Sequence, residues 1–161
     1  MKKTFLYSLF AFFLLLLLPV HVLVLADLEK TVKIEPYYKS VTFSLRWTHS
    51  VEKEDWEEFF QVEDENILLQ STRFKTFGAG VPDNAGEETF IKDGWVYMTN
   101  IHQPIGDSLQ FQTGKETNHR LFIKEEHLSL SPQQSYDLYT TKMPIYEYLF
   151  SLIIATRGEN L

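Results

Sequence analysis

Regular alternation of apolar and polar side chains is the feature that most constrains the fold of this chain. From Val41 to Thr48, apolar residues alternate one for one with polar residues. Because successive side chains of a β-strand point to opposite faces, this pattern predicts a strand with one buried face. Two further runs, 88–92 and 95–99, are joined by Asp93-Gly94, a pair that suits the positive-φ positions of a type I′ hairpin. The sequence therefore predicts antiparallel pairing.

Several other short runs fit the same pattern. We expect strands at 58–63, 67–77, 108–112 and 120–124, with shorter candidates at 128–130 and 136–140. Short strands separated by polar turns, with no helical pattern between them, are typical of an antiparallel β-protein rather than a βαβ fold. The expected fold class is all-β, either an antiparallel sandwich or a partly open barrel.

One stretch near the end of the chain has helical spacing. Tyr146, Leu149, Phe150 and Ile153 recur at i, i+3, i+4 and i+7 behind Pro144. We expect a short C-terminal helix that caps the open end of the sheet. A second contact with a membrane or a partner is the alternative.

A run of 22 uncharged residues, Phe5 to Ala26, follows Lys2 and Lys3. As one helix it would be about 33 Å long, enough for the hydrocarbon layer of a membrane. Alternatively, Phe5 to Leu18 is the core of a cleavable signal peptide, Pro19 breaks its helix and cleavage occurs near Ala26. Both interpretations divide the chain into a leader, 1–26, and one domain, 27–161, outside the cytoplasm.

The expected domain is strongly acidic. Without Lys2 and Lys3 it keeps 13 of the 15 basic residues against 22 acidic ones, a formal charge of −9. Such a domain is repelled by phosphate backbones, so we expect no nucleic-acid partner. The chain has no cysteine, which excludes disulfides, thiolate nucleophiles and thiolate metal sites.

A metal site has no support from residue spacing. His49, His102, His119 and His127 form no HxH or HxxxH pair, and the acidic run at 54–57 lacks the alternating Asp/Asn pattern of a calcium loop. We expect no metal and no cofactor.

The segment from Trp47 to Phe59 is the densest in side chains capable of chemistry. His49 with Glu52 or Glu58 could form a base and its orienting carboxylate, with Ser50 as a nucleophile. Neighbouring residues of a strand point to opposite faces, however, so His49 and Ser50 would not meet if the strand continued through them. We favour a strand end and turn, and expect no catalytic residues.

A second candidate segment is the glycine-rich corner at 77–82. Gly78, Gly80 and Pro82 lie there, but the pattern matches neither a dinucleotide fingerprint nor a phosphate-binding loop. Arg73 lies in the predicted strand just before the corner, so this cation and backbone N–H groups of the corner could together hold an anion. A structural corner is the interpretation we prefer.

The three tryptophans, Trp47, Trp56 and Trp95, lie in predicted strands or beside their turns. Aromatic side chains at strand positions usually belong to the core. A surface on which a ligand stacks is the alternative.

Taken together, three motifs resemble a bacterial family catalogued as domain of unknown function 1850. They are Trp47-Thr48-His49-Ser50-Val51-Glu52-Lys53 with Trp56 and Glu58, then 72–82, then Asp93-Gly94, and the similarity extends from Thr42 to Lys124. The resemblance implies a small exported or membrane-anchored protein, often encoded beside TRAP-type transporters of the TAXI class. It implies no catalytic residues.

The sequence and the resemblance together lead to one functional expectation. We expect a non-enzymatic accessory domain outside the cytoplasm, anchored to the membrane by residues 5–26 or released after cleavage, that contacts TRAP-type transporter membrane subunits. An extracytoplasmic module for a small ligand or ion is the alternative. The expected functional surface combines two segments and their strands: His49, Ser50, Glu52, Glu58, Arg73, Gly78, Gly80 and Pro82.

Overall fold

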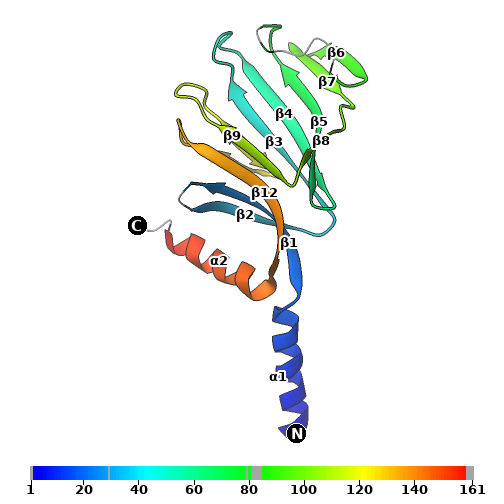
Figure 1. The fold of residues 1–161 in the computed structure, drawn as a ribbon, viewed down its shortest axis with the longest axis vertical. Coiled ribbons are helices and arrows are strands. Elements are labelled where there is room, and N and C mark those ends of the chain that lie inside the picture. The colour runs from blue at the N-terminus through cyan, green and yellow to red at the C-terminus, as the bar shows by residue number, and fades with distance from the viewer. Residues whose placement is uncertain (1, 29, 79, 81–84, 159–161) are drawn as a thin grey trace.

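The computed structural model describes residues 2–28, 30–78, 80 and 85–158, in which antiparallel sheets have an N-terminal and a C-terminal helix, both at the same end of the sheets (Figure 1). The elements in chain order are α1 (Lys2–Leu16), β1 (Pro19–Asp27), β2 (Thr31–Tyr37), β3 (Ser40–Thr48), β4 (Asp55–Glu63), β5 (Asn66–Phe74), β6 (Glu88–Lys92), β7 (Trp95–Thr99), β8 (Gln103–Gly106), β9 (Ser108–Gln112), β10 (Arg120–Ile123), β11 (Glu126–Ser129), β12 (Ser135–Pro144) and α2 (Ile145–Gly158).

The smaller sheet has four strands in the order β2-β1-β12-β9. Strand β1 pairs with β12 from Pro19, opposite Pro144, to Asp27, opposite Tyr136, and its other edge pairs with β2. Four consecutive apolar residues of β1, Val22 to Leu25, are only 0–1 % exposed. Strand β1 is therefore a central strand, buried on both faces.

The larger sheet has eight strands, seven of them in the order β11-β10-β3-β4-β5-β7-β6, with β8 paired to the start of β5. Each of the connections β3 to β4, β4 to β5, β6 to β7 and β10 to β11 joins adjacent antiparallel strands. Alternation along these strands gives the sheet one face toward the core and one outer face.

The main core lies between the two sheets. Leu23, Leu25 and Leu138 of the small sheet pack with Phe43 and Phe60 of the large sheet, whose rings stack at 4.8 Å. A second, smaller cluster contains Trp56, Phe74, Val96 and Met98. The expected antiparallel β-fold is confirmed, but the two sheets are not closed into a barrel.

The strand expectations from alternation are largely confirmed. The hairpin 88–92/95–99 and the strand 108–112 have the expected bounds, and β10 ends one residue early, at Ile123. Strand β5 ends at Phe74 instead of reaching position 77, and β4 begins three residues early, at Asp55. Strands β1, β2 and β8 were not among the expected runs.

The expectation of one helix over 5–26 is wrong for its second half. Helix α1 ends at Leu16, and Pro19–Asp27 form strand β1. A continuous apolar run does not distinguish a helix from a strand that is buried on both faces, because neither leaves polar positions at a regular spacing. The boundary expected after Ala26 thus falls within a strand of the small sheet.

The expected C-terminal helix is present as α2, but it does not cap the sheet. Its apolar side chains Tyr146, Leu149, Phe150 and Ile153 are exposed, although the helix contacts α1, β1 and β12. No helix among the described residues combines the length and apolar character needed to cross a membrane.

Candidate functional site

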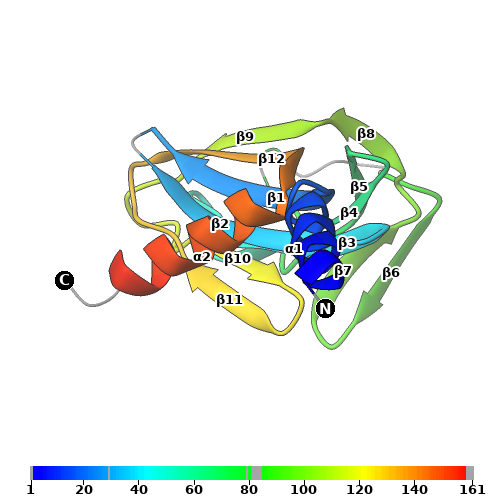
Figure 2. The same cartoon turned by 90° about the horizontal axis from the view of Figure 1, so that it is seen from below.

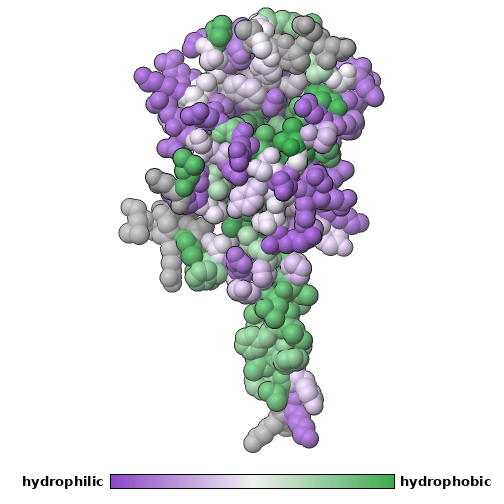
Figure 3. Space-filling view, in the orientation of Figure 1, coloured by the Kyte–Doolittle hydropathy of each residue, from purple (hydrophilic) through white to green (hydrophobic). Residues whose placement is uncertain are grey.

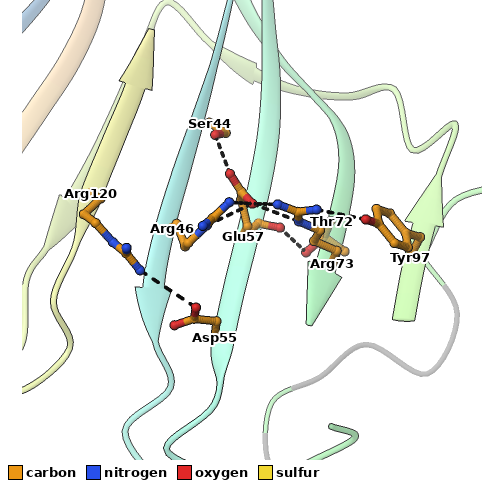
Figure 4. A network of polar contacts seen from close by, with 8 residues as sticks. All are labelled: Ser44, Arg46, Asp55, Glu57, Thr72, Arg73, Tyr97 and Arg120. Atoms are coloured by element: carbon orange, nitrogen blue, oxygen red, sulfur yellow. Dashed lines mark hydrogen bonds and ion pairs between the residues drawn. The ribbon is translucent and has the colours of Figure 1, made fainter. Parts of the chain in front are cut away.

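A single row of polar and aromatic residues crosses the outer face of the large sheet. The register places these residues opposite one another on neighbouring strands, in the order Ser129, Arg120, Arg46, Glu57, Arg73, Tyr97 and Phe90. Directly opposite residues of antiparallel strands share a face, so each side chain of the row can interact with the next one along the row. Figure 4 shows the central part of this row.

Glu57 is the centre of the row and is only 2 % exposed. Its Oε1 accepts a hydrogen bond from the Ser44 hydroxyl at 2.7 Å. Its Oε2 accepts bonds from Nε and Nη2 of Arg46, at 3.0 and 2.7 Å, and from Nε and Nη2 of Arg73, at 2.8 and 2.5 Å (Figure 4). Arg73 Nη1 donates to the Tyr97 hydroxyl at 2.8 Å. One buried carboxylate thus orients two guanidinium groups.

The electrostatics of this group favour the ionised carboxylate. Burial by itself would raise the pKa of Glu57, but hydrogen bonds from Ser44, Arg46 and Arg73 outweigh it and hold the pKa below the ordinary 4.5. Burial likewise opposes the charge of Arg73, yet Tyr97 and Glu57 raise the pKa of its guanidinium. Because two guanidinium cations face one carboxylate, this group of side chains carries a net positive charge on an otherwise acidic protein.

Aromatic rings surround these cations. Arg73 Cζ lies 4.4 Å from the centre of the Trp95 ring and 5.3 Å from that of Phe59, and Lys75 Nζ lies 4.3 Å from Trp95. Arg46 Cζ lies 5.0 Å from the Phe122 ring. These are cation–π distances. We call the outer-face set Arg46, Glu57, Phe59, Arg73, Lys75, Trp95, Tyr97 and Phe122 the arginine–aromatic patch.

A groove continues the arginine–aromatic patch along the strands. It has a volume of about 350 Å³ and lies between Phe59 and Phe122, with Gln61, Gln70 and Lys124 at its polar margin. The patch therefore offers flat aromatic faces, hydrogen-bonding groups and a shallow depression on one side of the sheet.

Three residues of the expected surface meet at one end of the large sheet. His49 directly follows β3, at the start of the turn to β4, and its Nδ1 forms an ion pair with Glu52 Oε2. The Glu52 side chain lies directly against Gly78, where a Cβ atom would overlap it. Gly78, near the start of the glycine-rich corner, is therefore a neighbour of the β3–β4 turn.

The remaining expected residues are distributed differently. Ser50 is exposed in the turn, and no hydrogen bond joins it to His49 in the described part of the chain. Gly80 adopts a φ of +81°, which favours glycine, whereas Gly78 does not have a positive φ. Pro82 lies outside the described residues. Among these positions, those that the structure describes form no assembled catalytic group.

Glu58 and Arg73 point to opposite faces of the large sheet. Glu58 lies opposite Leu45, a core residue, whereas Arg73 lies on the outer face opposite Glu57. Burial raises the pKa of Glu58 to about 7. Glu58 is thus a half-buried carboxyl on the core-facing side of the large sheet and does not belong to its outer face.

The histidines do not come together as metal ligands. No group of three or more potential ligands is present among the residues that the structure describes. His119 is stacked with Trp47 at 5.9 Å and bonded to the Thr117 hydroxyl at 2.7 Å, and burial lowers the pKa of its ring.

Sequence reasoning missed the centre of the arginine–aromatic patch. Arg46 occupies a polar position of the alternating run, and Glu57 belongs to the acidic run at 54–57, which we considered as a calcium loop and rejected. Counting outward from the β3–β4 turn would have placed Arg46 opposite Glu57, because hairpin register is fixed by its turn. Trp95 lies on this outer face, although we expected its ring in the core.

Comparisons with known proteins support the resemblance seen in the sequence. No curated protein and no solved structure matches the chain. The family model described as a domain of unknown function, DUF1850, matches residues 43–130, which extend from within β3 to the end of β11 and include the whole arginine–aromatic patch. The chain is therefore a member of the DUF1850 family.

Proposed function

We propose that the protein is a non-enzymatic accessory domain that binds another protein through the outer face of its large sheet. The observation that carries this proposal is the arginine–aromatic patch, centred on the buried Glu57. Tryptophan, tyrosine and arginine are the side chains most enriched among residues that dominate protein–protein binding. In the patch such side chains come from strands β3, β5 and β7 and are already held in place by mutual contacts.

Preorganisation is the second support for a binding role. Glu57 fixes both guanidinium groups, and the Tyr97 hydroxyl accepts a further hydrogen bond from Arg73. Side chains that are already ordered lose little conformational entropy when a partner binds. The shape of the patch also favours a protein, because its aromatic faces extend over a broad sheet rather than line a closed pocket.

The proposed partner is a membrane subunit of a TRAP-type transporter of the TAXI class. This part of the proposal rests on the family resemblance and on the N-terminal apolar segment. In this role the domain lies outside the cytoplasm, either tied to the membrane by the N-terminal segment or released after cleavage near Ala26. The locally positive patch would suit an acidic surface of the partner.

The proposal is tested by crosslinking the full-length protein in cells and identifying what is purified with it. We expect transporter membrane subunits with the wild type and a loss of them with Trp95→Ala. The matched control is Ile91→Ala, because Ile91 is on the same hairpin but on the opposite face and is more exposed. Equal recovery from both variants would contradict the proposed surface, provided that both melt like folded proteins.

A small-ligand module is the second candidate, and one depression favours it. It has a volume of about 610 Å³ and lies on the outer side of the small sheet, where Gln110, Asp137 and Tyr139 are among its lining residues. That volume is typical of small-molecule sites. We expect a ligand of this site to raise the melting temperature saturably, and Asp137→Asn to reduce the effect. No response to a panel of polyols, amines and metal ions would argue against this function.

A further inference from the structure

Two exposed apolar helices leave the domain from one point. Pro19 at the start of β1 is paired with Pro144 at the end of β12, and the Ile145 amide donates to the Leu18 carbonyl at 3.0 Å. Helix α1 projects away from the sheets along the long axis of the molecule, while α2 extends across the same end (Figures 1 and 2). Any surface that receives one helix therefore lies close to the other.

From Phe5 to Leu16, helix α1 is apolar on every side, with Ser8 its one hydroxyl residue other than Tyr7. Its large hydrophobic side chains from Phe5 to Leu15 are 42–70 % exposed, and they form the apolar column in Figure 3. An amphipathic helix that docks onto a protein has one apolar stripe, whereas a helix that is apolar all round is suited to lipid or to a large core. Among the described residues of this chain, no such core surrounds α1.

Helix α2 adds a second apolar surface at this end. Leu149, Phe150 and Ile153 are 45–63 % exposed, and they lie on one face of the helix. The β2–β3 turn contributes Tyr38, which is 86 % exposed, and Lys39, whose Nζ lies 5.8 Å from the Tyr38 ring. Tyrosine and lysine are side chains that position proteins at the boundary between lipid and water.

Strand β1 makes the leader part of the fold. Cleavage after Ala26 would remove residues 19–26, which separate β2 from β12 and supply Leu23 and Leu25 to the main core. The small sheet would lose a central strand, and β2 would lose its partner in that sheet.

From these observations we infer that the chain stays uncleaved at Ala26, and that α1 and α2 together bind a lipid bilayer. Helix α1, about 22 Å long at 1.5 Å per residue, enters the apolar layer, and α2 lies along the membrane surface with Tyr38 and Lys39 beside it. This inference rests on the membrane location proposed above but not on the arginine–aromatic patch. It also selects the retained anchor over the released domain.

The first test is the intact mass and N-terminal sequence of the folded protein recovered from cells that make the full chain. We expect residues 19–26 to be present in the membrane fraction. A soluble, folded protein that begins at Asp27 would overturn the inference. Loss of transporter crosslinking with β1 retained would instead count against the proposed function alone.

The second test uses the absence of cysteine in the full-length chain. A fluorophore that responds to polarity is attached to Phe10→Cys, Phe150→Cys or Ser50→Cys, and each protein is reconstituted into phosphatidylethanolamine–phosphatidylglycerol vesicles. Ser50 is the control because it is exposed in the β3–β4 turn, at the end of β3 away from the helices.

We expect emission from positions 10 and 150 to shift to shorter wavelength and to be quenched by a lipid-attached quencher. Emission from position 50 should respond only to an aqueous quencher. Quenching of position 150 by the aqueous quencher would show that α2 stays in water. Protection from both quenchers would show that another protein surface covers α2. Either result would overturn the inference for α2.

Discussion

Replacing Glu57 with glutamine tests whether the arginine–aromatic patch is organised as the structure indicates. The substitution keeps the size of the side chain and one carbonyl acceptor but removes the charge that balances Arg46 and Arg73. Removing one partner of a buried ion pair costs roughly 3–5 kcal/mol. The two arginine side chains are 23 % and 20 % exposed, so water recovers part of this loss. We therefore expect Glu57→Gln to lower the free energy of unfolding by about 2–4 kcal/mol.

The assay is urea denaturation of the full-length protein, and the matched control is Asp55→Asn. Asp55 lies two residues before Glu57 on the same face of β4, but its ion pair with Arg120 is longer, at 3.8 Å, and about one-third exposed. Surface pairs of this kind contribute roughly 0–1 kcal/mol. A loss below about 1 kcal/mol for Glu57→Gln, or equal losses for both variants at unchanged m-value, would refute the reasoning.

Three further predictions concern single sites. Burial raises the pKa of Glu58 from 4.5 to about 7, so the folded state holds its proton more strongly than the unfolded state. The free energy of unfolding should therefore fall by about 3 kcal/mol as pH rises from below 4.5 to above 7. Glu58→Gln should remove this pH dependence from denaturation curves measured across that range. Gly80→Val should lower the free energy of unfolding by about 1–2 kcal/mol because of the positive φ, and an unchanged melting temperature would contradict this. Gly78→Ala should lower the free energy of unfolding less in a Glu52→Ala background than in the wild type, because the added methyl group overlaps the Glu52 side chain. A double-mutant cycle with no coupling energy would show that the segments around residues 52 and 78 do not touch.

Much of the β-structure could be predicted because local chemistry decides it. Asp93-Gly94 fixes the hairpin at 88–99, and both residues adopt positive φ, as a type I′ turn requires. The alternation from Val41 to Thr48 likewise identified β3 and its two faces. These signals are contained in a few neighbouring residues, so no knowledge of the rest of the fold is needed.

Strand β1 and the arginine–aromatic patch could not be predicted because both depend on distant pairing. Val22 to Leu25 are buried on both faces only because β2 and β12 flank them and the rest of the chain covers them, and their composition alone also fits a helix. The patch appears only when Arg46, Glu57 and Arg73 are aligned across three strands. The meeting of Glu52 with Gly78, by contrast, needs only that β3, β4 and β5 are neighbours, which short hairpins favour.

The central claim, that the outer face of the large sheet binds a partner, is tested most directly by photo-crosslinking at Tyr97. A photoreactive phenylalanine replaces Tyr97 or Tyr139 in the full-length protein in cells. Both tyrosines are half-buried, and they lie on the outer faces of different sheets. The account predicts crosslinks from position 97 to transporter membrane subunits and none from position 139. The same crosslinks from both positions, or a partner found only from position 139, would contradict it.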